Sequence, residues 1–183
     1  MEVASDNILS TRVESTEAVV SLPSDNEIKI VRTFRAAVGA VFDAWTNTDQ
    51  ISAWWDPRRF PLAICELDLH PGGAFRFVPG GPDGGGHPFA GQYLEILPPS
   101  RLVFSTPGVT PASETIGTLD FADSGGQTVL TITMTCATRA DRDALLRARV
   151  DAGTIQSLNN LHSYLANAAA QPQQQSQLQP EDQ

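Results

Sequence analysis

The sequence predicts an α+β fold in which one antiparallel sheet is covered by a long C-terminal helix. Between about residues 64 and 136 there are six apolar segments of strand length, separated by short turn sequences that contain Gly, Pro or Ser. After them, the segment from Arg139 to about Ala166 has the apolar spacing of a helix. Because the connections are too short for parallel crossovers, we expect the strands to be antiparallel.

The first part of the folded unit contains one strand and two short helices. Glu27–Phe34 (EIKIVRTF) alternates apolar and polar residues with an imperfect period of two, which is typical of a strand. In the following AAVGAVFDAWTN, apolar residues recur every three or four positions, so we expect an amphipathic helix. The second helix is Thr48–Trp54, with Thr48 as its expected N-cap, and Pro57 ends it near Asp56.

Six more strands and the long helix complete the unit. The strands are expected at Ile64–Leu69, Ala74–Val78, Phe89–Leu97, Arg101–Thr106, Thr115–Phe121 and Thr128–Cys136. Thr138 or Asp141 is the expected cap of the long helix. The second half of that helix places Leu158, Leu161 and Leu165 on one face. A curved seven-stranded sheet and a single covering helix leave a wedge between them, and we expect function there.

The folded unit is expected at residues 26–167, between disordered ends at 1–25 and 168–183. Residues 1–25 have no sustained apolar period, and the C-terminal end is rich in Gln and Pro. The formal net charge of −9 argues against a nucleic-acid partner and against anionic membrane surfaces. The sequence also lacks a run of the roughly 20 apolar residues that a membrane helix needs.

The cysteines and histidines predict neither a metal site nor a reactive thiol. Cys65 and Cys136 lie in apolar segments, so we expect buried free thiols in a cytoplasmic protein. His70, His87 and His162 have no metal-ligand spacing. The glycine-rich GGPDGGG lacks the Lys-Ser/Thr ending of a phosphate loop and is interpreted as a hairpin connection. No metal and no cofactor are therefore expected.

Tyr93 and Glu95 are the candidate catalytic residues. They share one side of the strand Phe89–Leu97, on which neither side is cleanly apolar, so both side chains are candidates to face inward. A buried carboxyl beside a phenol would suit acid/base chemistry. The alternative is that Glu95 pairs with Arg76 or Arg101 and joins neighbouring strands.

Five segments of this sequence, in order, resemble one known family. They are AVFDAWTNTDQISAWWDP, ELDLHPGGAFRF, GQYLEILPPSRLVFS, LTITM and AGTIQSLNNLHSYL. The family is the branch of the START-like, helix-grip superfamily named for the activator of 90-kDa heat-shock-protein ATPase, and the resemblance covers about residues 27–166. It implies a helix-grip fold with a cavity beneath the long helix. Relatives of this type include carriers of apolar ligands, polyketide cyclases and co-chaperone modules, so the fold leaves the activity open.

The resemblance also gives the clustered tryptophans a context. All three, Trp45, Trp54 and Trp55, lie within a short segment that precedes Pro57. The family's fold places the Trp54–Trp55 pair at the mouth or end wall of the cavity, where indoles cover a large apolar area. The alternative is that these tryptophans fill the core and anchor the short helices.

One position departs from the family pattern. Where the family usually has Gly-Trp in the last helix, this chain has Gly153-Thr154. We hypothesise that Thr154 widens the cavity and adds a hydroxyl to its wall. The alternative is that a neighbour such as Phe42 or Met134 fills the space.

The leading functional hypothesis is binding of an apolar or aromatic small molecule between the sheet and the closing helix. The alternatives are a cyclase or hydratase that uses the same cavity, and a chaperone-assisting interaction module. Candidate partners are therefore an apolar small molecule, a chaperone or a second copy of the chain. The expected lining residues are Trp54, Trp55, Phe60, Phe75, Phe77, Tyr93, Phe104, Met134, Thr154 and Leu158.

Overall fold

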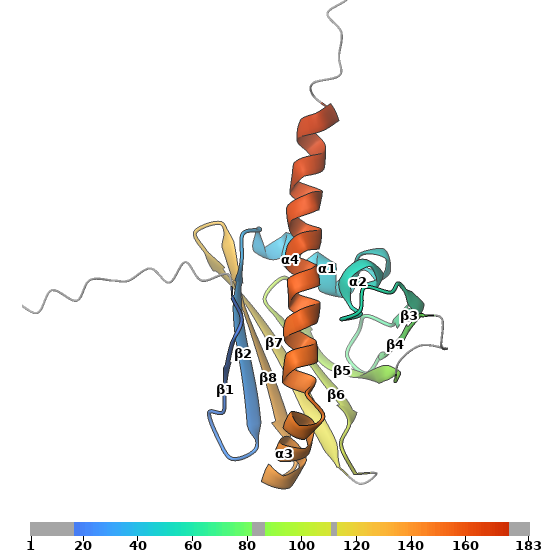
Figure 1. The fold of residues 1–183 in the computed structure, drawn as a ribbon, viewed down its shortest axis with the longest axis vertical. Helices are drawn as coiled ribbons and strands as arrows, with labels where there is room; N and C mark the ends of the chain where they lie inside the picture. Colours follow the sequence, from blue (N-terminus) through green and yellow to red (C-terminus); the bar gives the residue numbers. More distant parts are fainter. Residues whose placement is uncertain (1–16, 82–86, 111–112, 176–183) are drawn as a thin grey trace, which may run out of the picture.

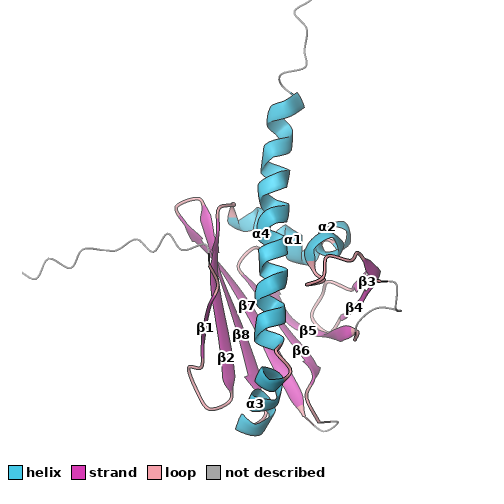
Figure 2. Ribbon diagram, in the orientation of Figure 1, coloured by secondary structure: helices cyan, strands magenta, loops and turns pink. Residues whose placement is uncertain are grey.

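A computed structural model describes residues 17–81, 87–110 and 113–175 of the chain. Within these ranges, one eight-stranded antiparallel sheet is packed with four helices (Figures 1 and 2). The strand order across the sheet is β1-β2-β8-β7-β6-β5-β4-β3. The α+β class and the antiparallel sheet are confirmed, whereas the expected count of seven strands is too low by one. Parts of the expected disordered ends and of the glycine-rich connection lie outside the described residues.

The elements have the following bounds. The strands are β1 (Val19–Ser21), β2 (Glu27–Phe34), β3 (Leu62–Leu67), β4 (Ala74–Pro79), β5 (Phe89–Leu97), β6 (Arg101–Pro107), β7 (Glu114–Ser124) and β8 (Gln127–Cys136). The helices are α1 (Val38–Thr46), α2 (Thr48–Trp54), α3 (Arg139–Arg147) and α4 (Val150–Gln175). In Figure 1, α4 crosses one face of the sheet, with α1 and α2 near one end of the strands and α3 at the other.

The additional strand is β1, at the edge of the sheet. It pairs antiparallel with β2, with Val19 opposite Val31 and Ser21 opposite Lys29. A segment of three residues is too short to show a period of two, so the sequence pattern did not reveal it. Ordered backbone therefore begins before residue 26, within a segment that we expected to be disordered.

The C-terminal segment forms two helices rather than the single one expected. Thr138 caps α3, because its Oγ1 accepts a hydrogen bond from the Asp141 backbone N–H at 3.1 Å. Between α3 and α4, Arg149 has a φ of 59°, a left-handed conformation that interrupts the helix. The second helix continues to Gln175, so residues 168–175 are helical. Ala and Gln have good helix propensity, and extending a packed helix avoids the cost of nucleation.

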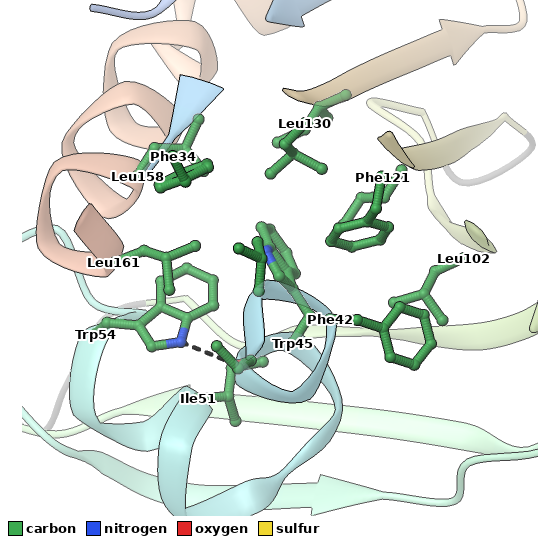
Figure 3. Packing of buried hydrophobic residues seen from close by; sticks show 14 of the residues in the cluster. Phe34, Phe42, Trp45, Ile51, Trp54, Leu102, Phe121, Leu130, Leu158 and Leu161 are labelled. Carbon is green, nitrogen blue, oxygen red and sulfur yellow. Dashed lines mark hydrogen bonds between the residues drawn. The ribbon is translucent and has the colours of Figure 1, made fainter. Parts of the chain in front are cut away.

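The two short helices are held together by a tryptophan. Asn47 rather than Thr48 caps α2, because its side chain accepts hydrogen bonds from the backbone N–H groups of Asp49 and Gln50 at 3.0 and 3.2 Å. The indole Nε1 of Trp54 donates to the carbonyl oxygen of Ala44 in α1 at 3.0 Å (Figure 3). Trp54 is 1% exposed, so it is a core residue that joins α1 to α2.

The hydrophobic core lies between the sheet and helices α1, α2 and α4. On β2, alternate residues face this core, as the strand period requires. Figure 3 shows side chains from the sheet and these helices pointing into the same space. The labelled members are Phe34, Phe42, Trp45, Ile51, Trp54, Leu102, Phe121, Leu130, Leu158 and Leu161, all of which are buried.

Two glycines provide a matched test of this packing. A Cβ at Gly117 in β7 would lie 2.4 Å from ring atoms of Phe104, whereas a Cβ at Gly153 in α4 would meet nothing within 4 Å. We expect Gly117→Ala to lower the free energy of unfolding by about 1–3 kcal/mol, because the ring must move. Gly153→Ala should raise it by about 0.5–1 kcal/mol through better helix propensity. Urea unfolding measures both changes, and equal effects of the two substitutions would contradict the packing described.

Candidate functional site

Aromatic side chains from β4, β5 and β6 converge on the tryptophans of α1 and of the segment after α2. They enclose a small half-open hollow, here called the aromatic pocket. Its lining residues are Trp45, Ile51, Trp55, Phe75, Phe77, Phe89, Tyr93, Leu102, Phe104 and Leu119. The hollow has a volume of about 20 Å³. This is room for about one water molecule, whereas ligand pockets usually span roughly 300–1,000 Å³.

The rings of the aromatic pocket are in direct contact. The centroid of the Trp55 ring lies 4.8 Å from that of Phe77 and 5.1 Å from that of Phe89. The Phe75 and Phe104 rings meet edge to face, with centroids 5.4 Å apart. Trp55, Phe89 and Phe104 are partly exposed, whereas Phe75 and Phe77 are buried. The three partly exposed rings are therefore the ones that separate the pocket from solvent.

Two polar groups on the lining side chains have no partner among the described residues. The indole Nε1 of Trp45 is buried and makes no hydrogen bond, although the side chain is 8% exposed overall. Tyr93 is buried, and burial, with a smaller contribution from Cys65, raises the pKa of its hydroxyl. Tyr93 therefore stays protonated near neutral pH and is a hydrogen-bonding group rather than a base. Both groups belong to side chains that line the aromatic pocket.

A set of hydrogen bonds, here called the α2–α4 joint, fixes the backbone beside Trp55. Ser157 Oγ donates to the Trp55 carbonyl oxygen at 2.7 Å. One turn along α4, Asn160 Nδ2 donates to the Asp56 carbonyl oxygen at 2.9 Å, and Asn160 Oδ1 accepts from Arg59 Nε at 3.1 Å. Asn160 is buried, so its amide satisfies backbone and guanidinium groups that water does not reach freely.

Half of the expected lining residues lie in the aromatic pocket. These are Trp55, Phe75, Phe77, Tyr93 and Phe104. Trp54 and Leu158 belong instead to the buried core, and Met134 packs at its margin. Phe60 is 38% exposed, and the Arg58 guanidinium carbon lies 5.3 Å from the centroid of its ring.

Five lining residues were not anticipated: Trp45, Ile51, Phe89, Leu102 and Leu119. Trp45 and Ile51 lie on the apolar faces of the two short helices, which periodicity does reveal. Which part of the sheet those faces would cover depends on tertiary packing, and the sequence pattern does not contain that information.

The hypothesis that Thr154 widens the cavity gains no support from the position of Thr154. It is not among the residues that line the aromatic pocket. Its Oγ1 donates to the carbonyl oxygen of Val150 at 2.9 Å, within the first turns of α4. A local bond of this kind is common for Thr in helices and places no hydroxyl in a cavity wall.

Glu95 does not join Tyr93 in the aromatic pocket. Tyr93 lies opposite Phe104 on β6 but Glu95 lies opposite Val103, because the register of β5 shifts between them. Paired residues on neighbouring strands face the same side, and successive residues face opposite sides. The two candidate catalytic side chains therefore lie on different faces of the sheet. Glu95 Oε1 lies 3.3 Å from Arg101 Nε, so the alternative cross-strand pairing is the one observed.

A second, wider hollow of about 440 Å³ lies over β3, β4 and β5. Its walls include Glu66, Asp68 and Arg76, which are exposed. Glu66 and Asp68 face solvent. Because water screens these charges, the wide hollow offers a ligand little desolvated surface. The aromatic pocket is therefore the better candidate for a binding site.

Two absences in the described part of the chain bear on function. Among residues 17–81, 87–110 and 113–175, no group of three or more His, Cys, Asp or Glu side chains is placed to hold a metal ion. Of the helices in the described part of the chain, none has the length and apolar character needed to cross a membrane.

Comparisons with known proteins agree with this architecture. A family model described as "Activator of Hsp90 ATPase homolog 1-like protein" matches residues 35–166. A crystal structure of a Rhodobacter sphaeroides protein is 27% identical, with a TM-score of 0.73 over 82% of this chain and 99% of that one. A Chromobacterium violaceum protein is 25% identical, with a TM-score of 0.64 over 76% of this chain and 97% of that one. Among curated proteins, none matches the chain.

A Nitrosomonas europaea protein shows the same fold at lower identity. It is 20% identical, with a TM-score of 0.72 over 81% of this chain and 99% of that one. The expected helix-grip architecture is therefore confirmed.

The α2–α4 joint can be tested with two asparagines of the same helix. We expect Asn160→Ala to lower the free energy of unfolding by about 1–3 kcal/mol, because the Asp56 carbonyl oxygen keeps only the Arg59 backbone N–H as a donor and Arg59 Nε loses its acceptor. Asn167→Ala is the control, since Asn167 is exposed on α4. Its effect should stay within about 0.5 kcal/mol. Urea unfolding followed by circular dichroism measures both, and similar losses would contradict the role assigned to the joint.

The thiol beside the pocket has a distinct pH dependence. Burial, and secondarily the Asp49 carboxylate, raises the pKa of Cys65 from 9.0 to about 11. Alkylation of Cys65 by iodoacetamide, followed by peptide mass spectrometry, should therefore be half-maximal near pH 11 in the folded protein and near pH 9 in urea. The folded state binds this proton more tightly, so the thiol's contribution to stability falls between those pH values. A midpoint near 9 in the folded protein would contradict the assignment.

Proposed function

Because the chain belongs to the Activator of Hsp90 ATPase homolog 1-like protein family, we propose that it binds a neutral, apolar small molecule in the aromatic pocket. Proteins of this family commonly bind hydrophobic ligands. The observation that carries the proposal is the lining itself, in which seven aromatic rings and three aliphatic side chains meet without a charged residue. Such a surface favours a ligand with a ring that can pack edge to face or offset against these side chains.

The small size of the hollow sets the mode of binding. A space of about 20 Å³ does not hold an organic ligand, so rings must move to admit one. The rings of Trp55, Phe89 and Phe104 are the partly exposed members of the lining, so they are the ones that can turn toward solvent. The backbone at Trp55 stays in place, since Ser157 Oγ is bonded to its carbonyl oxygen. Binding therefore selects a more open arrangement of side chains on a fixed framework.

The unpaired polar groups narrow the class of ligand. Trp45 Nε1 can only donate a hydrogen bond, and Tyr93 can donate one or accept one. A ligand that carries one oxygen acceptor would satisfy a buried donor that is otherwise unpaired. A ligand with a charged group would gain no ion pair from the lining residues and would lose its hydration. The proposal assigns binding and no reaction, because Glu95 lies on the other face of the sheet.

Trp55 gives the sharpest test of this function. The uncharged probe N-phenyl-naphthylamine should give a saturable rise in fluorescence with the wild-type protein. Trp55→Leu should weaken its binding by about tenfold, or ~1.4 kcal/mol, because one ring contact with the probe is lost. Phe60→Leu is the control, since Phe60 is an exposed aromatic residue outside the pocket lining. No saturable signal, or equal weakening by both variants, would contradict the proposed pocket.

A further inference from the structure

Arg32 is a charged residue on the face of the sheet that the helices cover. It lies on β2, in the inward-facing row that also contains Ile30 and Phe34. Its exposed fraction is 5%. Removing a guanidinium from water is costly, and the cost is normally offset by a carboxylate partner.

The contacts of Arg32 leave one edge of its guanidinium unpaired. Nη1 donates to Oδ1 of Asn159 on α4, and the guanidinium carbon lies 5.4 Å from the centroid of the Phe34 ring. Nε is buried and makes no hydrogen bond. Among residues 17–81, 87–110 and 113–175, no carboxylate forms an ion pair with Arg32. The edge of the guanidinium formed by Nε and Nη2 therefore has no hydrogen-bond or ion-pair partner among the described residues.

His162 and Arg35 lie in the same region of the structure as Arg32. Burial lowers the pKa of His162 on α4, and the charges of Arg32 and Arg35 lower it further. The rings of His162 and Phe34 lie 6.4 Å apart, so the imidazole is near the same part of β2. Within the described part of the chain, Arg35 also has no carboxylate partner. The local field thus favours a negative group that the described residues do not provide.

We propose that the Nε–Nη2 edge of Arg32 binds the carboxylate group of a small molecule. Two parallel N–H donors on this edge match the two oxygens of a carboxylate, which gives a bidentate, charge-assisted pair. The bond from Nη1 to Asn159 and the Phe34 ring hold the guanidinium plane in one orientation. The planar edge of the guanidinium matches a planar carboxylate better than a tetrahedral anion. This site is separate from the aromatic pocket, whose lining residues do not include Arg32.

An NMR titration of the full chain tests the contact directly, with acetate as the probe. The Arg32 Nε–Hε signal should shift in a saturable way as sodium acetate is added. Sodium chloride at equal ionic strength should not reproduce the shift, and sodium phosphate should produce a weaker one. An Arg32 signal that responds equally to acetate and chloride would overturn the site, and a response to phosphate alone would overturn the assignment to a carboxylate.

Thermal unfolding of two arginine variants separates binding from a purely structural role. Arg32→Met removes an unpaired buried charge, so its Tm without acetate should equal or exceed that of the wild type. Acetate should raise the Tm of the wild type and leave that of Arg32→Met unchanged. Arg101→Met is the control, because Arg101 already contacts Glu95 and Asp120. It should lower the Tm and keep the acetate response. A lower Tm for Arg32→Met, with its acetate response retained, would show that Arg32 is only structural.

Discussion

The hydrogen bonds between α4 and the segment after α2 determine where the aromatic side chains lie. Ser157 and Asn160 bind the carbonyl oxygens of Trp55 and Asp56, and both acceptors lie next to the end of a helix, where backbone groups lack helical partners. The side chain of Trp55 is thereby presented to Phe77 and to β5. Among the described residues, the other contacts between α4 and the short helices are apolar packing, which has no preferred direction.

This arrangement explains why the binding site that we propose is small. The sheet is wide and the covering helices are few, so aromatic side chains from β4 to β6 fill part of the space that helices would otherwise occupy. Gly117 makes this packing possible, because a residue without a side chain leaves room for the Phe104 ring. The hollow is lined by apolar groups, and such a space favours an apolar molecule over water once the outer rings move.

The sequence predicted the elements of the fold more completely than the composition of the site. Alternation on β2 and the turn residues after each strand were sufficient for the antiparallel sheet, since both are local properties. β1 is too short to show a period, and the break at Arg149 depends on one backbone conformation. The register shift between Tyr93 and Glu95 also cannot be predicted from alternation of apolar and polar residues. This shift places the Glu95 side chain on the other face of the sheet. Residue type was therefore enough to predict the five expected aromatic residues of the pocket. The position of Glu95 depended on strand register and was not predicted.

Adjacent residues of α4 connect the two candidate sites. Asn159 accepts a hydrogen bond from Arg32 on β2, and Asn160 donates one to the Asp56 carbonyl oxygen beyond α2. Successive residues of a helix point about 100° apart, because there are 3.6 residues per turn. One turn of α4 is thus bonded to the sheet on one side and to the end of the aromatic pocket on the other. A shift of that turn on binding at either place would change the geometry of both bonds, which is the condition for two sites to influence each other's affinity.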